Sequence, residues 1–164
     1  MSDLALSGTE LLVWTDETAT RWEKFLTENP AVFALPCDIA GVHNVAELLQ
    51  HIVAVELRHA QRFTGEEPIG YADVPYNSVE EIAAVHRRAH TRFEELLKQP
   101  KFFWAEKIAF VTRSAGTLTA SRRKVFFHAQ MHSIRHYAQL TTIVRQHGYK
   151  PGWMGDFIGT ETME

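Results

Sequence analysis

Three histidines at a regular spacing are the residues of this sequence best suited to chemistry. His128, His132 and His136 fall four residues apart in the stretch VFFHAQMHSIRHYAQLTTIVRQHG. On a helix, each step of four residues drifts by only about 40°, so the three side chains share one face with Leu140. Imidazoles on an apolar face are costly unless their ring nitrogens find partners. The spacing indicates half of a metal site, with core hydrogen bonding or a pH-sensitive surface as the alternatives.

A third ligand has to come from another helix, and His51 is the candidate for it. His51 shares a stripe with Leu48 and Val55, so we expect its side chain to point inward. Three imidazoles leave one position open around a four-coordinate metal, as in catalytic zinc sites. Imidazole ligands suit zinc, nickel, copper or iron, and the sequence does not choose among them.

The other histidines fit structural or surface roles better than a metal site. His86 and His90 are also four residues apart, but the neighbouring Arg87 indicates a solvated boundary. His43 and His59 are expected at the surface or at helix caps. These positions are therefore left out of the predicted site.

The composition is that of an ordinary globular protein. The 164 residues are 45% hydrophobic and 23% charged, which suits one domain over residues 1–164. A net charge of -3 argues against a nucleic-acid partner. No apolar run approaches the roughly 20 residues that span a bilayer, and the N-terminus lacks a signal-peptide pattern. The single cysteine, Cys37, fits a reducing compartment, so we expect a cytoplasmic protein without a membrane partner.

Four amphipathic helices are expected to position these residues, over residues 9–28, 44–64, 78–99 and 121–147. Capping pairs mark the first three helix starts, namely Ser7 with Glu10, Asn44 with Glu47 and Ser78 with Glu81. Residues 101–120 alternate only weakly, and we expect a small hairpin turning at Ser114-Ala115-Gly116 or an irregular crossover. The pattern predicts an all-α four-helix bundle with a longer connection before the last helix.

These motifs, taken in order, resemble the DinB-like superfamily. The resemblance covers residues 45–158 and rests on LLQHIVAVELRHAQRFTGE, HAQMHSIRHYAQL and RQHGYKPGWMGDFI. That superfamily includes the DinB and YfiT-type metalloenzymes and thiol-dependent S-transferases related to mycothiol-dependent maleylpyruvate isomerase. Many members carry His-Arg-Gly-Gln where this chain has HYAQ at residues 136–139, so an arginine that would help to hold a substrate or partner is missing.

The resemblance implies both a ligand set and an assembly. His51, His132 and His136 would be the metal ligands, His128 would lie beside the site, and Gln139 would support it by hydrogen bonding. The same resemblance implies a homodimer. The core is the first expectation for the aromatic side chains, but some of them would line such an interface, because they exceed what one small bundle must bury: Trp14, Trp22 and the run Phe102-Phe103-Trp104.

An open metal position allows two kinds of chemistry. It can lower the pKa of a bound water for hydrolysis, or bind a small thiol as its thiolate. The resemblance favours the second, with zinc or nickel activating a low-molecular-weight thiol for transfer to an electrophilic substrate. The non-enzymatic alternative is a structural metal in a stress-linked binding module, with His128 as a fourth ligand. Glu56 lies about 140° from His51 around the helix and is expected to face elsewhere, so no general base is identified.

Overall fold

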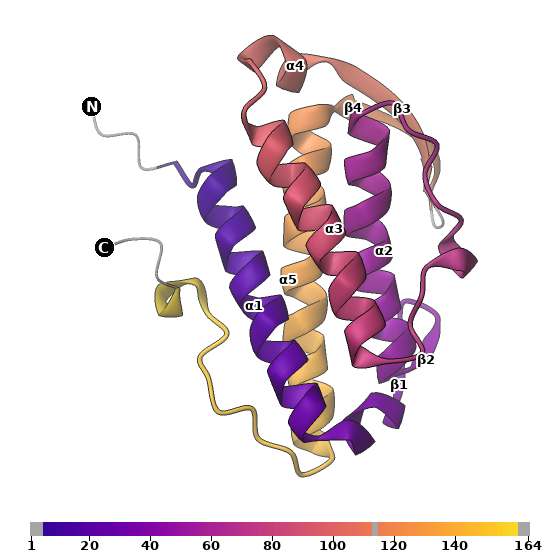
Figure 1. The fold of residues 1–164 in the computed structure, drawn as a ribbon, viewed down its shortest axis with the longest axis vertical. Coiled ribbons are helices and arrows are strands. Elements are labelled where there is room, and N and C mark those ends of the chain that lie inside the picture. Colours follow the sequence, from indigo (N-terminus) through magenta and orange to yellow (C-terminus); the bar gives the residue numbers. More distant parts are fainter. Residues whose placement is uncertain (1–4, 113–114, 161–164) are drawn as a thin grey trace.

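Four long helices lying side by side make up most of the protein (Figure 1). The computed structural model describes residues 5–112 and 115–160. The long helices are α1 (Gly8–Glu28), α2 (Val45–Phe63), α3 (Val79–Leu97) and α5 (Arg122–Gln146). Helices α2 and α1 each pack against both α3 and α5. The expected all-α class is therefore right for the helices, but it omits a small sheet that the structure adds near α2.

The helices begin at the capping residues that the sequence predicts. The Ser7 hydroxyl accepts from the Glu10 amide, and the Glu10 carboxylate accepts from the Ser7 amide, which closes a capping box. Asn44 and Ser78 accept in the same way at the starts of α2 and α3. Each predicted helix agrees with the observed one to within two residues, as for α3, expected over 78–99.

The unexpected sheet is a short hairpin before α2. Strands β1 (Pro36–Ile39) and β2 (Val42–Asn44) pair antiparallel in the connection between the first two predicted helices, where no strand is expected. The turn between them holds Ala40 at φ 55° and Gly41 at φ 74°. Two consecutive residues with positive φ make the kind of tight turn that suits the twist of a hairpin. The strands are too short to show the alternation of apolar and polar residues that would predict them.

The connection before α5 contains a short helix and the expected hairpin. Helix α4 (Lys101–Ala105) is followed by β3 (Lys107–Thr112) and β4 (Gly116–Ser121), which pair antiparallel. Of the expected turn residues, Ser114 lies outside the described residues. Phe110 is the buried residue of β3, and its ring lies 5.3 Å from that of His59 on α2.

Single helical turns and a C-terminal segment complete the fold. The 3-10 turns are Pro30–Ala34, Tyr71–Asp73 and Phe157–Gly159. The segment after α5 runs back along α1 (Figure 1), where Trp153 packs edge-on against the buried Trp22. Among the helices that the structure describes, none combines the length and the apolar character needed to cross a membrane.

Candidate metal centre

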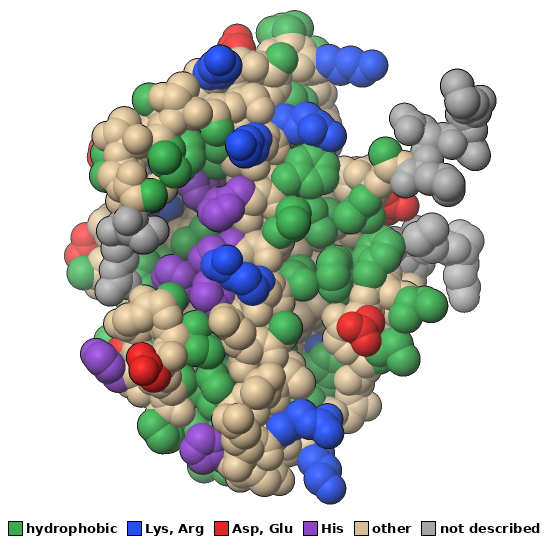
Figure 2. Space-filling model, turned by 180° about the vertical axis from the view of Figure 1, so that it is seen from behind, with side chains coloured by type: hydrophobic (Ala, Val, Ile, Leu, Met, Phe, Trp, Pro, Cys, Tyr) green, Lys and Arg blue, Asp and Glu red, His purple; other side chains and the backbone are tan. Residues whose placement is uncertain are grey.

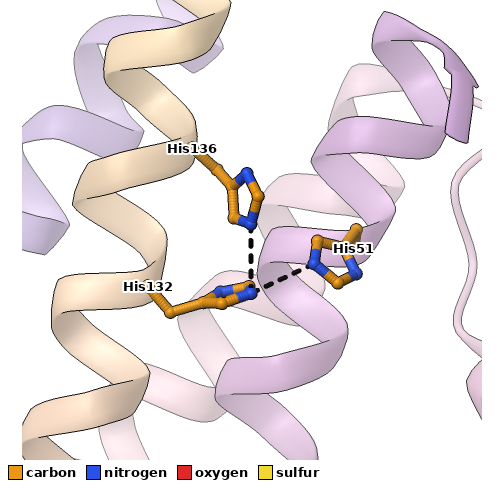
Figure 3. A group of neighbouring side chains, drawn as sticks. All are labelled: His51, His132 and His136. Carbon is orange, nitrogen blue, oxygen red and sulfur yellow. Dashed lines mark hydrogen bonds between the residues drawn. The ribbon is translucent and has the colours of Figure 1, made fainter. Parts of the chain in front are cut away.

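The structure brings one histidine of α2 together with two of α5 (Figure 3). The Nε2 atom of His132 lies 3.0 Å from Nε2 of His51 and 3.1 Å from Nε2 of His136. One ring nitrogen from each residue lies within 4.8 Å of the others. Within residues 5–112 and 115–160, this is the one group of three or more His, Cys, Asp or Glu side chains close enough to share a metal ion. Segments separated by about eighty positions in the sequence thus meet at one point.

The three histidines fit a shared cation, because hydrogen bonds among them cannot satisfy all of their facing ring nitrogens. The Gln139 amide oxygen lies 2.7 Å from His136 Nδ1, so that nitrogen carries the hydrogen and Nε2 presents a lone pair. His132 Nε2 faces two other ring nitrogens, and one hydrogen satisfies only one such contact. A shared cation satisfies all three lone pairs. Ligands of a tetrahedral zinc lie about 3.3 Å apart, close to the observed separations.

Hydrogen bonds on the far side of the rings orient two of the three histidines. His136 is held by Gln139, and His51 Nδ1 lies 3.1 Å from the Tyr71 hydroxyl. Such outer partners fix the tautomer and the ring orientation of metal-binding histidines. The Nδ1 atom of His132 is buried and, among the described residues, has no hydrogen-bond partner. Its ring is therefore held by packing.

Burial favours the neutral form of His132 and His136. Desolvation, followed by the nearby His136 and His51, lowers the pKa of His132 to about 2. Desolvation also lowers the pKa of His136, although its hydrogen bond with Gln139 opposes the shift. Neutral imidazole is the form that binds metals, so the lowered pKa of His132 and His136 favours metal binding at neutral pH.

His128 lies beside the cluster and outside it. Its ring centroid is 5.8 Å from that of His132 and 6.1 Å from that of His59. The side chain is exposed, and it is not a member of the three-histidine group. In the structure His128 is thus a neighbour of the cluster, and Gln139 forms a hydrogen bond with one of its members.

A basic side chain, Arg135, lies at the outer side of the cluster. Figure 2 shows histidines gathered on one face, with Lys or Arg side chains next to them. Arg135 is exposed, and its Nη2 lies 3.4 Å from His136 Nε2. The charge of Arg135 contributes to the lowered pKa of His128, His132 and His136. A positive potential at this face favours an anionic ligand.

A second buried polar cluster, which is not among the predicted sites, contains one residue from each long helix. His86 Nε2 on α3 donates to Asp16 Oδ1 on α1 at 3.1 Å, and His86 Nδ1 donates to Glu56 Oε2 on α2 at 2.7 Å. Ser133 of α5 donates to the other Glu56 oxygen at 2.6 Å. His86 is 6% exposed and Glu56 is 1% exposed. The predicted solvated boundary for His86 is therefore wrong.

A signal for this cluster exists in the sequence. His86 lies four residues after the buried Ile82, and Glu56 lies four residues after the buried Ile52. Both residues thus fall on the apolar stripes of their helices, where a charge occurs only with a partner. The adjacent Arg87 conceals this signal, because it is exposed to solvent and indicates a polar surface at this part of α3.

The expected surface position of His59 is also wrong. His59 is 5% exposed, because Phe110 of β3 lies over its ring. Its pKa is lowered to about 3, first by burial and then by Arg62 and His128. The hairpin that covers His59 comes some fifty residues later in the chain, so no local pattern reveals the burial.

His86 and His59 predict opposite pH dependences. Burial alone would lower the pKa of His86, but Glu56 and Asp16 outweigh it and raise that pKa to about 10. The stabilisation from His86 is therefore complete below its unfolded pKa of 6.5 and is lost as the pH rises towards 10. Neutral His59 stabilises above pH 6.5, and this contribution is lost as the pH falls towards 3.

We therefore expect the free energy of unfolding of the metal-free protein to fall on both sides of about pH 6.5. Urea titrations in a chelating buffer would measure it. The variant His59→Gln should show a shallower acid side, by up to about 1.4 kcal/mol per pH unit. The exposed His43→Gln variant should follow the wild type. An acid side equally steep in all three proteins would contradict the assignment to His59.

Comparison with known families shows which family the chain belongs to. The model of the DinB family matches residues 1–163, and the chain belongs to this family. None of the curated proteins matches the chain. Family membership and the three neighbouring histidines fit a DinB-like metalloprotein.

Proposed function

We propose that this protein binds a divalent transition metal through His51, His132 and His136 and uses it to activate a low-molecular-weight thiol for transfer to an electrophile. The observation that carries the proposal is the convergence of three ring nitrogens, with His132 Nε2 at 3.0 and 3.1 Å from the other two. Imidazole donors suit zinc or nickel. DinB membership supports the metal, and the resemblance to thiol-dependent S-transferases supports the thiol.

Each neighbouring side chain has a role in this proposal. A bound metal would hold the thiol as its thiolate, because coordination to a cation removes the thiol proton. Gln139 and Tyr71 would keep two of the imidazoles oriented through their Nδ1 atoms. Arg135 would bind an anionic group of the thiol substrate, which compensates for the arginine missing from the HYAQ run. The thiol proton would pass to solvent water, because coordination would lower the thiol pKa, so no protein base is required.

Two observations favour this reading over its alternatives. A structural metal would take a fourth protein ligand, but His128 lies outside the group of His, Cys, Asp and Glu side chains that the described residues bring together. A hydrolase would benefit from a carboxylate base, but Glu56 is engaged by His86 and Ser133. Both alternatives remain outcomes of the experiment that follows.

The experiment measures turnover by metal-loaded protein without a histidine tag. A panel of low-molecular-weight thiols would be mixed with a chromogenic electrophile, and an ester substrate would be tested without thiol. Turnover that requires both metal and thiol supports the transferase. Ester hydrolysis without thiol would show a hydrolase, and retained metal with neither activity would show a structural metal. His43→Ala, loaded in the same way, is the matched control, because that histidine is exposed and outside the cluster.

Arg135 gives this proposal a prediction about substrate charge. Arg135→Ala should raise KM for a carboxylate-bearing thiol about tenfold, because one charge-assisted hydrogen bond is lost. KM for an uncharged thiol should change little. Arg145→Ala removes an exposed arginine of the same helix away from the cluster and should leave both values unchanged. Equal effects of Arg135→Ala on charged and uncharged thiols would contradict this role.

The proposal also covers the oligomeric state, the cellular location and the partners of the protein. We propose a single four-helix-bundle domain that works as a cytoplasmic homodimer and takes small molecules rather than nucleic acid as partners. The single cysteine and the net charge of -3 support the setting and the absence of nucleic acid. Light scattering on the purified protein tests the dimer, and a monomer mass at micromolar concentration would contradict it.

A further inference from the structure

A cavity between α1, α2 and α3 lies apart from the three-histidine cluster. Its volume is about 270 Å³, and none of the three clustered histidines lines it. Most of its walls are apolar, including Ala19, Trp22, Leu49, Val53, Ile82 and Ala83. That size is close to the lower end of small-molecule sites, which combine apolar walls with a few placed polar groups.

The polar end of the cavity is formed by Asp16 and His86. The Asp16 side chain is 39% exposed, so its carboxylate is accessible from the cavity although one oxygen accepts from His86. His90 Nε2 lies 3.8 Å from the same oxygen. The other charged groups on the wall, Arg87 and Glu23, are paired with each other at 3.0 Å.

Next to the polar end of the cavity, the negative charges outnumber the positive charges. His86 is buried between two carboxylates, Asp16 and Glu56, and it carries at most one positive charge. Glu56 also accepts from the neutral Ser133 hydroxyl, and His90 lies between Asp16 and Glu94. Even when His90 and Arg87 are counted with the glutamates that they face, four carboxylates meet at most three cations, so at least one negative charge is in excess beside a largely apolar cavity, where a monocation would be stabilised.

A metal ion is a poorer match for this charge than an organic cation. The three-histidine cluster is the one group among the described residues with three candidate metal ligands close enough together, and Asp16 is not part of it. An ammonium group offers three donors to the Asp16 carboxylate, and an apolar body can pack against the Trp22 ring. The cavity therefore matches a cation that carries its own apolar surface.

We propose that this cavity is a second binding site, which takes a small apolar amine with its ammonium group on Asp16 and its hydrocarbon body against Trp22. The site is separate from the proposed transferase chemistry and does not depend on it. Binding here requires no metal. Occupation would bridge α1 and α3, and would therefore stabilise the folded protein.

Calorimetric titration of the full-length protein with benzylamine tests the site. We expect binding that is at least about tenfold tighter than that of benzyl alcohol and no detectable binding of benzoate. Asp16→Asn should weaken benzylamine binding at least about tenfold, because the charge is lost while the shape is kept. Asp38→Asn, the same change at an exposed strand position, should have no effect.

A second variant separates the site from folding effects. Ala83→Leu fills the cavity without changing any charge and should abolish benzylamine binding, while the metal content stays at the wild-type value. Benzylamine that binds no better than benzyl alcohol, or binds Asp16→Asn and Ala83→Leu as well as the wild type, would overturn the proposal. If Asp16→Asn does not fold, the comparison of the three ligands and the Ala83→Leu variant decide the question.

Discussion

Replacing His86 with alanine is expected to destabilise the protein by about 3–5 kcal/mol, because it leaves the Glu56 carboxylate buried without its cationic partner. Glu56 is 1% exposed, and its only other hydrogen bond in the cluster comes from Ser133. A buried charge without a partner is far less stable than the same charge in water. Urea unfolding followed by circular dichroism at pH 7 would measure the loss.

A control and a rescue separate the charge from the missing side chain. Arg87→Ala breaks an ion pair that is 58% exposed at the arginine and should change the stability by at most about 1 kcal/mol. Adding Glu56→Gln to His86→Ala should recover part of the lost stability, since the amide is neutral. If the double variant is less stable than His86→Ala alone, the uncompensated charge is not the cause.

Loss of His132 is expected to abolish stabilisation by metal. An ion that binds only the folded state at a thousand times its Kd adds about 4 kcal/mol to the free energy of unfolding. His132 lies between the other two histidines, so the variant His132→Ala removes the central ligand and should remove nearly all of that gain. Unfolding with and without zinc or nickel would measure the difference for each protein.

His128→Ala is the matched control for this prediction. It removes a histidine of the same helix whose ring lies beside the cluster but outside the three-residue group. The metal response should stay near the wild-type value. Loss of the response in His128→Ala would indicate a four-ligand structural site, and a full response in His132→Ala would remove that residue from the site.

Local sequence signals are enough to predict the long helices and to single out the clustered histidines of the last helix. Capping pairs such as Ser7 with Glu10 act between neighbours in the chain, so they are visible in the sequence and present in the structure. The spacing of His132 and His136 sets them on one face whatever the rest of the chain does. His51 could be linked to them only through its inward stripe and the family resemblance, because nothing local specifies which helices meet.

Contacts between helices account for what the sequence does not show. Glu56 and His86 each lie on an apolar stripe, but their pairing requires that α2 and α3 be neighbours. The burial of His59 requires β3, which a weakly alternating segment contributes from elsewhere in the chain. The β1–β2 hairpin is missed because its strands are short and its turn uses Ala40 at positive φ, which few non-glycine residues adopt.

The central claim is that His51, His132 and His136 together hold one metal ion. The most direct test is the metal content of protein purified without a histidine tag, measured by elemental analysis for the wild type, His51→Ala and His132→Ala. We predict about one divalent transition metal ion per chain in the wild type and almost none in either variant, while His43→Ala keeps the wild-type content. A metal content that is unchanged in both ligand variants would contradict the three-histidine site.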